Sequence, residues 1–179
     1  MELITSININ NDMFVEVRID DLVENPLNTC SERGGVSLSL EHSRYSLGNE
    51  YAKNVKLDDA DWRIRISAYE HGDITLSIGE IQGWDYTDVG IAYIRKKDMQ
   101  ALKMDNAAAL KQTEQILDTY NSYLRGDAYI YTLYRSKVCG CCNHMGKEEL
   151  DEVSDIGDML TRDELYVVFQ IEKKEEQEK

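Results

Sequence analysis

The most chemically distinctive stretch of the sequence is the hexapeptide Cys139-Gly140-Cys141-Cys142-Asn143-His144. Cys139 and Cys142 have the spacing of a zinc knuckle, in which two thiolates on one turn hold the same ion. Cys141 and His144 are further candidate ligands within the same six residues. Zinc prefers four tetrahedral ligands, however, and one short hexapeptide rarely wraps the ion alone.

A second pair of ligands is missing from the sequence. The other cysteine and histidines stand singly and far from the hexapeptide: Cys30, His42 and His71. Three interpretations of the hexapeptide therefore stay open, namely a structural zinc site, a redox pair of thiols, and a turn whose thiols bind nothing. The sequence requires no cofactor, and zinc is the one that this stretch would accommodate.

The sequence holds few groups that are arranged for catalysis. His144 is two residues from Cys142, which is too close within a turn for the usual Cys–His dyad. His71 falls at the tip of a predicted hairpin, where a solvated residue is more common than a general base. The sequence has no glycine-rich phosphate loop, no G-x-S-x-G elbow and no H-E-x-x-H helix. We therefore expect a protein that is not an enzyme.

The charge is strongly acidic and unevenly distributed. The formal net charge is −14 at pH 7, of which residues 1–90 carry −10, residues 91–146 carry +3 and residues 147–179 carry −7. Direct binding to nucleic acid is not expected, because such binding needs Lys and Arg to displace counterions. The charge fits instead a partner with a basic surface that otherwise holds nucleic acid. The alternative is an acidic surface that serves solubility alone.

The candidate partner-binding residues lie in three acidic segments. They are Asp20, Asp21 and Glu24 in the first, Asp58, Asp59 and Asp61 in the second, and Glu148, Glu149, Asp151, Glu152, Asp155 and Asp158 in the third. The predicted partner is a host protein or nucleoprotein complex with a basic surface.

The elements that position these groups are clearest between residues 106 and 135. At 100° per residue, six side chains share an apolar arc of about 140°. They are Leu110, Ile116, Leu117, Tyr120, Tyr123 and Leu124. Asn106 is the predicted N-cap, and Gly126 is the predicted C-terminal stop. Residues 127–135 follow as a predicted central strand, since both of its faces are apolar.

The rest of the chain reads mainly as strands. Trp62–Glu80 alternates as a hairpin with a turn at residues 70–73. Further strands are predicted at residues 3–9, 13–19, 36–40, 89–94, 148–153 and 165–171, with a short helix at 98–104 and a turn or loop at Pro26. Strand 89–94, the long helix and strand 127–135 are candidates for one crossover unit.

The pattern predicts an α+β fold in which a mixed or antiparallel sheet packs against one principal amphipathic helix at about residues 106–125. A single domain is expected over residues 1–171, followed by a charged tail at 172–179. No secretory signal is seen, and no apolar run approaches the roughly 20 residues of a membrane span. The crowded cysteines do not look like a secreted disulfide framework, so we expect a cytoplasmic protein.

Four stretches together resemble a family of small acidic proteins encoded by bacteriophages and related mobile elements. They are His42-Ser43-Arg44-Tyr45-Ser46-Leu47-Gly48-Asn49, the region from Ile81-Gln82-Gly83-Trp84 through Ile94, Tyr120 to Tyr134, and the Cys139/Cys142 pair. The order and spacing agree over most of residues 25–155. The family tends to carry a Cys-Trp-Gly-like segment after the cysteine pair, where this chain has Ser154-Asp155-Ile156-Gly157.

The resemblance implies host takeover or counter-defence, and it brings no active site that can be carried over. By analogy with such proteins, we expect a non-enzymatic inhibitor of a host CRISPR or restriction complex, acting through a basic host surface by mimicry of nucleic acid. The alternative is a small zinc-supported protein-binding module built around Cys139 and Cys142.

Overall fold

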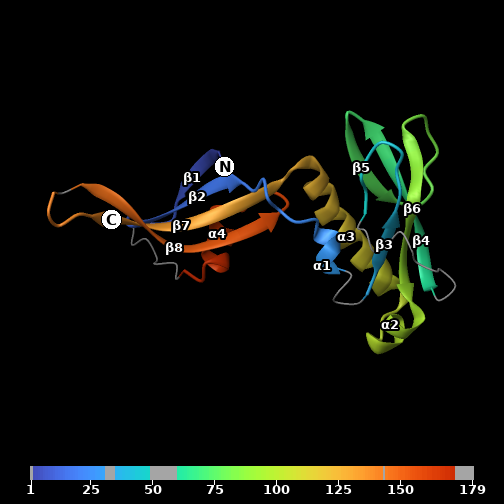
Figure 1. The fold of residues 1–179 in the computed structure, drawn as a ribbon. Coiled ribbons are helices and arrows are strands. Elements are labelled where there is room, and N and C mark those ends of the chain that lie inside the picture. Colours follow the sequence, from blue (N-terminus) through green and yellow to red (C-terminus); the bar gives the residue numbers. More distant parts are fainter. Residues whose placement is uncertain (1, 31–34, 49–59, 143, 172–179) are drawn as a thin grey trace. The chain divides into compact units, whose positions relative to one another are not determined.

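The computed structural model describes residues 2–30, 35–48, 60–142 and 144–171 (Figure 1). The chain forms two compact units, unit 1 with Met1–Val23 and Asp127–Lys179, and unit 2 with Glu24–Gly126. The predicted α+β class is confirmed, but the strands form two four-stranded antiparallel sheets. One domain over residues 1–171 stays a prediction. The predicted tail at 172–179 lies outside the described residues.

Unit 1 is built on a sheet with the strand order β1-β2-β7-β8. Its elements are β1 (Leu3–Asn8), β2 (Met13–Ile19), β7 (Ala128–Val138), β8 (Met145–Ile156) and the helix α4 (Arg162–Val168). β7 pairs with β8 as far as Val138, whereas β2 accompanies β7 only as far as Arg135. The end of the β7–β8 hairpin therefore continues past β2 as a ribbon of two strands.

The chain segment Leu165–Ile171 is predicted as a strand, and this prediction is wrong. Thr161 and Glu164 instead form a capping box, in which the Glu164 carboxylate accepts from Thr161 N at 2.7 Å. Leu165 and Phe169, four residues apart, pack into the core against β2 and β7. A short apolar run suits either element, and here the cap and the i, i+4 spacing select the helix.

Unit 2 is built on a sheet with the strand order β3-β6-β4-β5. Its elements are α1 (Pro26–Cys30), β3 (Ser37–Leu40), β4 (Ala60–His71), β5 (Asp73–Ile78), β6 (Tyr86–Arg95), α2 (Lys96–Ala101) and α3 (Asn106–Arg125). The predicted hairpin is confirmed as β4–β5, with Gly72 at φ 93° in the turn. Leu117 and Tyr120 of α3 pack against Ile66 and Leu76 of the sheet.

Helix α3 has the predicted bounds, and Gly126 ends it in the left-handed conformation at φ 80°. The N-cap is Asp105 rather than Asn106, because the Asp105 carboxylate accepts from Ala108 N at 2.8 Å. The buried face includes Ala109, whereas Leu110 is exposed, so the apolar arc is rotated from the predicted one. Among the described residues, no helix is both long and apolar enough to cross a membrane.

Two polar side chains of α3 complete the hydrogen bonding of the sheet. The side-chain amide of Asn121 accepts from Leu76 N at 2.8 Å and donates to Leu76 O at 3.0 Å. Gln112 accepts from Val36 N at 3.2 Å. Because β5 is an edge strand, Asn121 satisfies backbone groups that have no neighbouring strand.

Two further predictions are corrected by the structure. Pro26 begins the short helix α1, since a proline is tolerated where the helix needs no amide donor. The predicted crossover unit does not form, because β6 lies in the sheet of unit 2 and β7 in that of unit 1. β7 is a central strand, as its two apolar faces indicate, but its neighbours are β2 and β8, both antiparallel to it.

Candidate functional site

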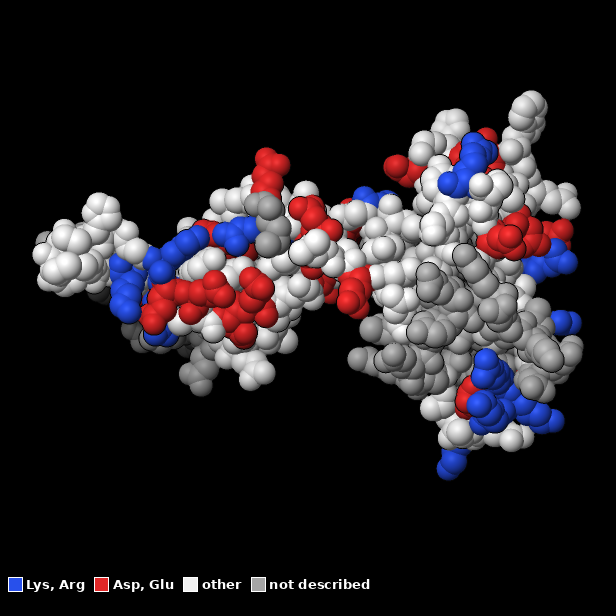
Figure 2. Space-filling view, in the orientation of Figure 1, with Lys and Arg blue, Asp and Glu red and all other residues white. Residues whose placement is uncertain are grey.

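The structure gathers five of the predicted acidic residues on one edge strand. They are Glu148, Glu149, Asp151, Glu152 and Asp155, all on β8. β8 pairs only with β7, so its other backbone edge carries no strand in the described chain. The first four side chains are exposed and Asp155 is half-buried. Acidic side chains gather over this part of unit 1 in Figure 2.

A β-bulge distributes these carboxylates over both faces of the sheet. Leu133 pairs with Asp151 and Tyr134 with Glu149, so Leu150 is the extra residue. Glu149 and Glu152 consequently share one face, whereas Asp151 and Asp155 share the other. The edge is therefore acidic from either side.

Most of these carboxylates have no cationic partner within the part of the chain that the structure describes. Glu148 lies 3.7 Å from Lys137 Nζ, and Glu152 accepts from the Thr132 hydroxyl at 3.1 Å. Lys147 also lies on β8, but it forms an ion pair with Glu16 of β2, whose carboxylate oxygen is 2.6 Å from Lys147 Nζ. The exposed acids of β8 thus keep most of their negative charge available.

Glu16 is an acidic residue of the same sheet that the sequence does not single out. It is only 9% exposed and is paired with both Lys147 and Arg18. Lys147 Nζ also lies 4.1 Å from the centroid of the Tyr134 ring. Arg18 is two residues from Glu16 in the chain, but the second partner, Lys147, is 131 residues away and cannot be found from local spacing. It is a neutralised structural group.

The other predicted acidic residues divide between the units. Asp20 and Asp21 follow β2, and Asp20 N donates to Ala128 O, whose residue pairs with Ile156 of β8. These two acids therefore lie at the same end of the sheet as Asp155 and the exposed Asp158. Glu24 and Asp61 are exposed but belong to unit 2, and Asp58 and Asp59 lie outside the described residues.

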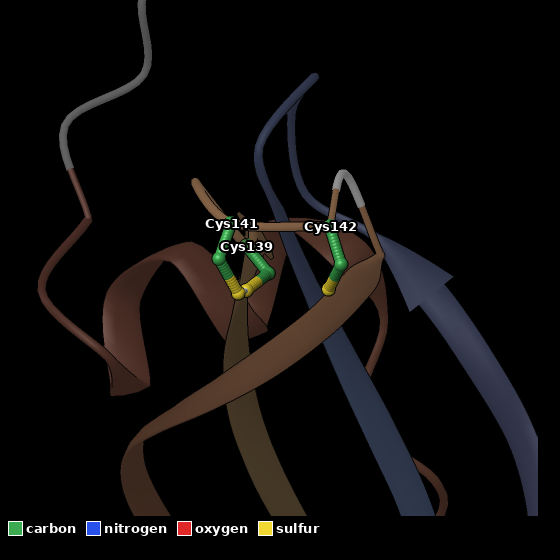
Figure 3. Close-up of side chains that lie close together, drawn as sticks. All are labelled: Cys139, Cys141 and Cys142. Carbon is green, nitrogen blue, oxygen red and sulfur yellow. Dashed lines mark hydrogen bonds between the residues drawn. The ribbon is translucent and has the colours of Figure 1, made fainter.

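The structure brings three thiols together at the end of the β7–β8 hairpin. The Sγ atoms of Cys139, Cys141 and Cys142 all lie within 4.8 Å of one another. Figure 3 shows the three side chains projecting to the same side of the turn. The sulfur atoms of Cys139 and Cys141 are 2.8 Å apart. Cys139 N donates to His144 O at 2.9 Å and closes the turn. The His144 side chain, predicted as a ligand, is exposed and does not join the cluster.

Because the thiols of Cys139 and Cys141 are in contact, their pKa values move in opposite directions. The pKa of Cys139 is lowered to about 7, chiefly because the Cys141 side chain hydrogen-bonds to its thiolate. The pKa of Cys141 is raised, because its proton is held in that same contact with Cys139. At pH 7 a substantial fraction of Cys139 is therefore thiolate, and in that form it accepts a hydrogen bond from the Cys141 thiol.

His42 forms a polar cluster that sequence reasoning missed. His42 Nδ1 accepts from Arg44 N at 3.1 Å and from Tyr45 N at 3.2 Å. The proton of the neutral ring is therefore on Nε2, which donates to a carboxylate oxygen of Glu70 at 2.8 Å. This contact lowers the pKa of Glu70. Both ring nitrogens are occupied and the side chain is 2% exposed, so His42 fixes a loop onto β4.

The abundance of tyrosine also has a structural explanation. The buried Tyr120 hydroxyl accepts from Gly48 N at 2.9 Å, and the buried Tyr131 hydroxyl accepts from Leu160 N at 2.9 Å. Burial raises the pKa of both phenols. Each ring fills the core while its hydroxyl satisfies a loop amide, which phenylalanine cannot do.

Comparison with family models, with curated proteins and with solved structures finds no match.

Proposed function

We propose that the protein is a non-enzymatic inhibitor that uses β8 to occupy a basic, nucleic-acid-binding surface of a host protein complex. The observation that supports this proposal is the row of exposed carboxylates on an edge strand. Their partners would be Lys and Arg side chains that otherwise contact phosphates. The resemblance to bacteriophage proteins directs the proposal to host defence complexes of the CRISPR or restriction type.

The spacing of the charges supports mimicry of a nucleic acid strand. A β-strand advances about 3.3 Å per residue, so the five carboxylates between Glu148 and Asp155 fall within about 23 Å. One DNA strand carries about one charge per 3.4 Å of helix axis, or about seven charges over that length. β8 therefore offers about two-thirds of that linear charge density.

The position of the charges supports the same proposal. An edge strand leaves its outer side accessible, and the bulge at Leu150 presents carboxylates on both faces. A basic groove would thus meet negative charge on each of its walls. Asp20, Asp21 and Asp158 extend the acidic surface at the end of the sheet where β2 finishes and β8 ends.

The test is binding of the full-length protein to purified host CRISPR and restriction complexes across a salt series, with displacement of a fluorescent DNA as the readout. We expect DNA displacement by the protein, with an affinity that falls steeply as salt rises. The double variant Glu149→Lys/Asp151→Lys should weaken binding roughly 10-fold or more, because repulsion replaces attraction.

The matched control is Asp73→Lys/Glu80→Lys, which makes the same change of charge at exposed positions of unit 2. It should bind as the unaltered protein does. Salt-independent binding, equal loss in both double variants, or no DNA displacement from any complex of these types would contradict the proposal.

A further inference from the structure

The end of the β7–β8 hairpin differs chemically from the rest of unit 1. Residues 138–146 contain no Asp, Glu, Lys or Arg, although the strands on either side are rich in charge. Cys141 and Cys142 are exposed, Cys139 is half-buried, and the ribbon that carries them continues past β2. The acidic function proposed for β8 makes no use of these thiols.

We propose that Cys139, Cys141 and Cys142 form a three-thiolate site for a soft metal ion, Zn²⁺ or Cu⁺, with a further coordination position open to solvent. The three Sγ atoms already lie within 4.8 Å of one another on one side of the turn. Metal–sulfur bonds of about 2.3 Å place thiolates about 3.8 Å apart in a tetrahedral site. Small side-chain rotations are therefore enough to bring all three sulfurs to one ion.

The backbone of the turn supports this arrangement. The hydrogen bond from Cys139 N to His144 O joins the two strands directly below the thiols. Cys139 and His144, which flank the other ligands, are thus already held together, and little chain entropy is lost when the ion binds. This feature removes the objection that a hexapeptide must first wrap around the metal.

The donor set selects the class of ion. Only sulfur atoms belong to the cluster of ligand atoms in the described chain, and no carboxylate oxygen joins them. Thiolates favour soft ions such as Cu⁺ and Zn²⁺, whereas Mg²⁺ and Ca²⁺ require oxygen ligands. Cu⁺ is satisfied by three sulfurs, and Zn²⁺ completes its tetrahedron with a water molecule at the open position.

Loading the site exchanges protons for the metal. Each thiol that becomes a ligand releases one proton, so three thiols yield three bound thiolates and no electron is transferred. The positive charge of the bound ion favours the ionised form of each thiol that it contacts. Binding should therefore weaken as the pH falls, because protons compete with the ion for the thiolates.

The test uses the full-length protein, purified without an affinity tag and kept reduced with a non-thiol phosphine. Co²⁺ is titrated as a spectroscopic substitute for Zn²⁺, and Zn²⁺ and Cu⁺ are then added separately in competition with a chromophoric chelator. We expect sulfur-to-cobalt charge-transfer absorption that saturates at an equimolar ratio, and retention of Zn²⁺ or Cu⁺ against the chelator. Mg²⁺ should not displace the Co²⁺.

Serine substitutions decide which residues hold the ion. Cys139→Ser, Cys141→Ser and Cys142→Ser should each weaken binding by about 100-fold or more. Loss of a metal ligand costs more affinity than loss of a group that only hydrogen-bonds to a ligand. Cys30→Ser is the matched control, because it changes the fourth cysteine of the sequence, and His144→Ala tests the excluded imidazole. Both controls should bind as the unaltered protein does.

Three results would overturn the three-thiolate site. One is failure of the unaltered protein to retain either Zn²⁺ or Cu⁺ against the chelator. Another is unchanged affinity in the three hairpin variants. The third is loss of binding in Cys30→Ser or His144→Ala. Binding of host complexes by the hairpin variants is measured in parallel, and it should be unchanged, so failure of the metal site is distinguishable from failure of the proposed inhibitory function.

Discussion

The two units each cover one sheet with a helix, but the helices differ greatly in length. Each has a four-stranded antiparallel sheet, but unit 2 packs its sheet against the 20-residue α3, whereas unit 1 uses the seven-residue α4. Among the residues that the structure describes, the buried apolar cluster around α3 contains 15 and the one around α4 contains seven. Unit 2 therefore removes about twice as many apolar side chains from water in its main cluster.

The edges of the two sheets differ as well. In unit 2, Asn121 hydrogen-bonds the backbone of Leu76 on the edge strand β5. In unit 1, the edge strand β8 carries a row of exposed acids and continues into the thiol turn. The larger apolar cluster and the hydrogen-bonded sheet edge are thus in unit 2. The exposed row of acids and the thiol cluster, on which the two proposals rest, are in unit 1.

The largest expected effect is in the packing of unit 2. A β-carbon at Gly90 would lie 2.0 Å from Ser39 O, and Gly90 has a φ of 142°. Gly90→Ala should therefore lower the free energy of unfolding by more than about 3 kcal/mol, because β3 must separate from β6. Urea denaturation and hydrogen exchange of the β3 and β6 amides measure this.

The matched control for that substitution is Gly72→Ala in the β4–β5 turn. Its added β-carbon would meet nothing within 4 Å, and only the φ of 93° opposes it. The expected loss is about 1–2 kcal/mol. Equal losses in the two variants would show that close packing of β3 on β6 is not what distinguishes unit 2.

The next largest effect compares one buried hydroxyl in each unit. Tyr120→Phe leaves Gly48 N without its acceptor, and Tyr131→Phe does the same to Leu160 N. Each should lower the free energy of unfolding by about 1–3 kcal/mol. The loss should be larger for Tyr120, because Asn25 also hydrogen-bonds its hydroxyl. Urea denaturation measures both, and a larger loss for Tyr131 would reverse the proposed ranking of the units.

A smaller effect concerns the thiols of unit 1. Cys141→Ala removes the main group that lowers the pKa of Cys139, so that pKa should rise from about 7. Less thiolate is then present at pH 7, and alkylation of Cys139 by iodoacetamide should slow several-fold. Peptide mass spectrometry over a pH series measures the rate. Cys142→Ala is the control and should slow the reaction less, because its contribution is the smaller one.

The smallest effect is the pH dependence that Glu70 gives to unit 2. Its pKa is lowered in the folded protein, mainly by the hydrogen bond from His42. The contribution to stability is therefore present above the ordinary Glu pKa of 4.5 and is lost as the pH falls through the lowered value. In a series of thermal melts from pH 6 to 3, Glu70→Gln should reduce the fall in melting temperature that accompanies the fall in pH. An unchanged fall would contradict the role of His42.

How much the sequence predicts differs between local and distant features. The sequence predicts α3 and the β4–β5 hairpin correctly. Hydrophobic periodicity and turn residues such as Gly126 and Gly72 act within a few residues of the chain. The strand predicted at Leu165–Ile171 was wrong, since a seven-residue apolar run fits either element until its cap and packing partners are known. The burial of Glu16 could not be predicted, because its partner Lys147 is distant in the sequence.

By itself, the sequence determined the α+β class, the long helix, most strands and the acidic character of β8, because each depends on local spacing or composition. Only the tertiary structure decided that α3 and β7, adjacent in the chain, belong to different units. It also decided which acids share an edge and that three thiols, without His144, meet at one turn. Strand order is set by contacts between residues that are far apart in the chain. The geometry of the thiol turn is local, but residue types and spacing alone do not specify it.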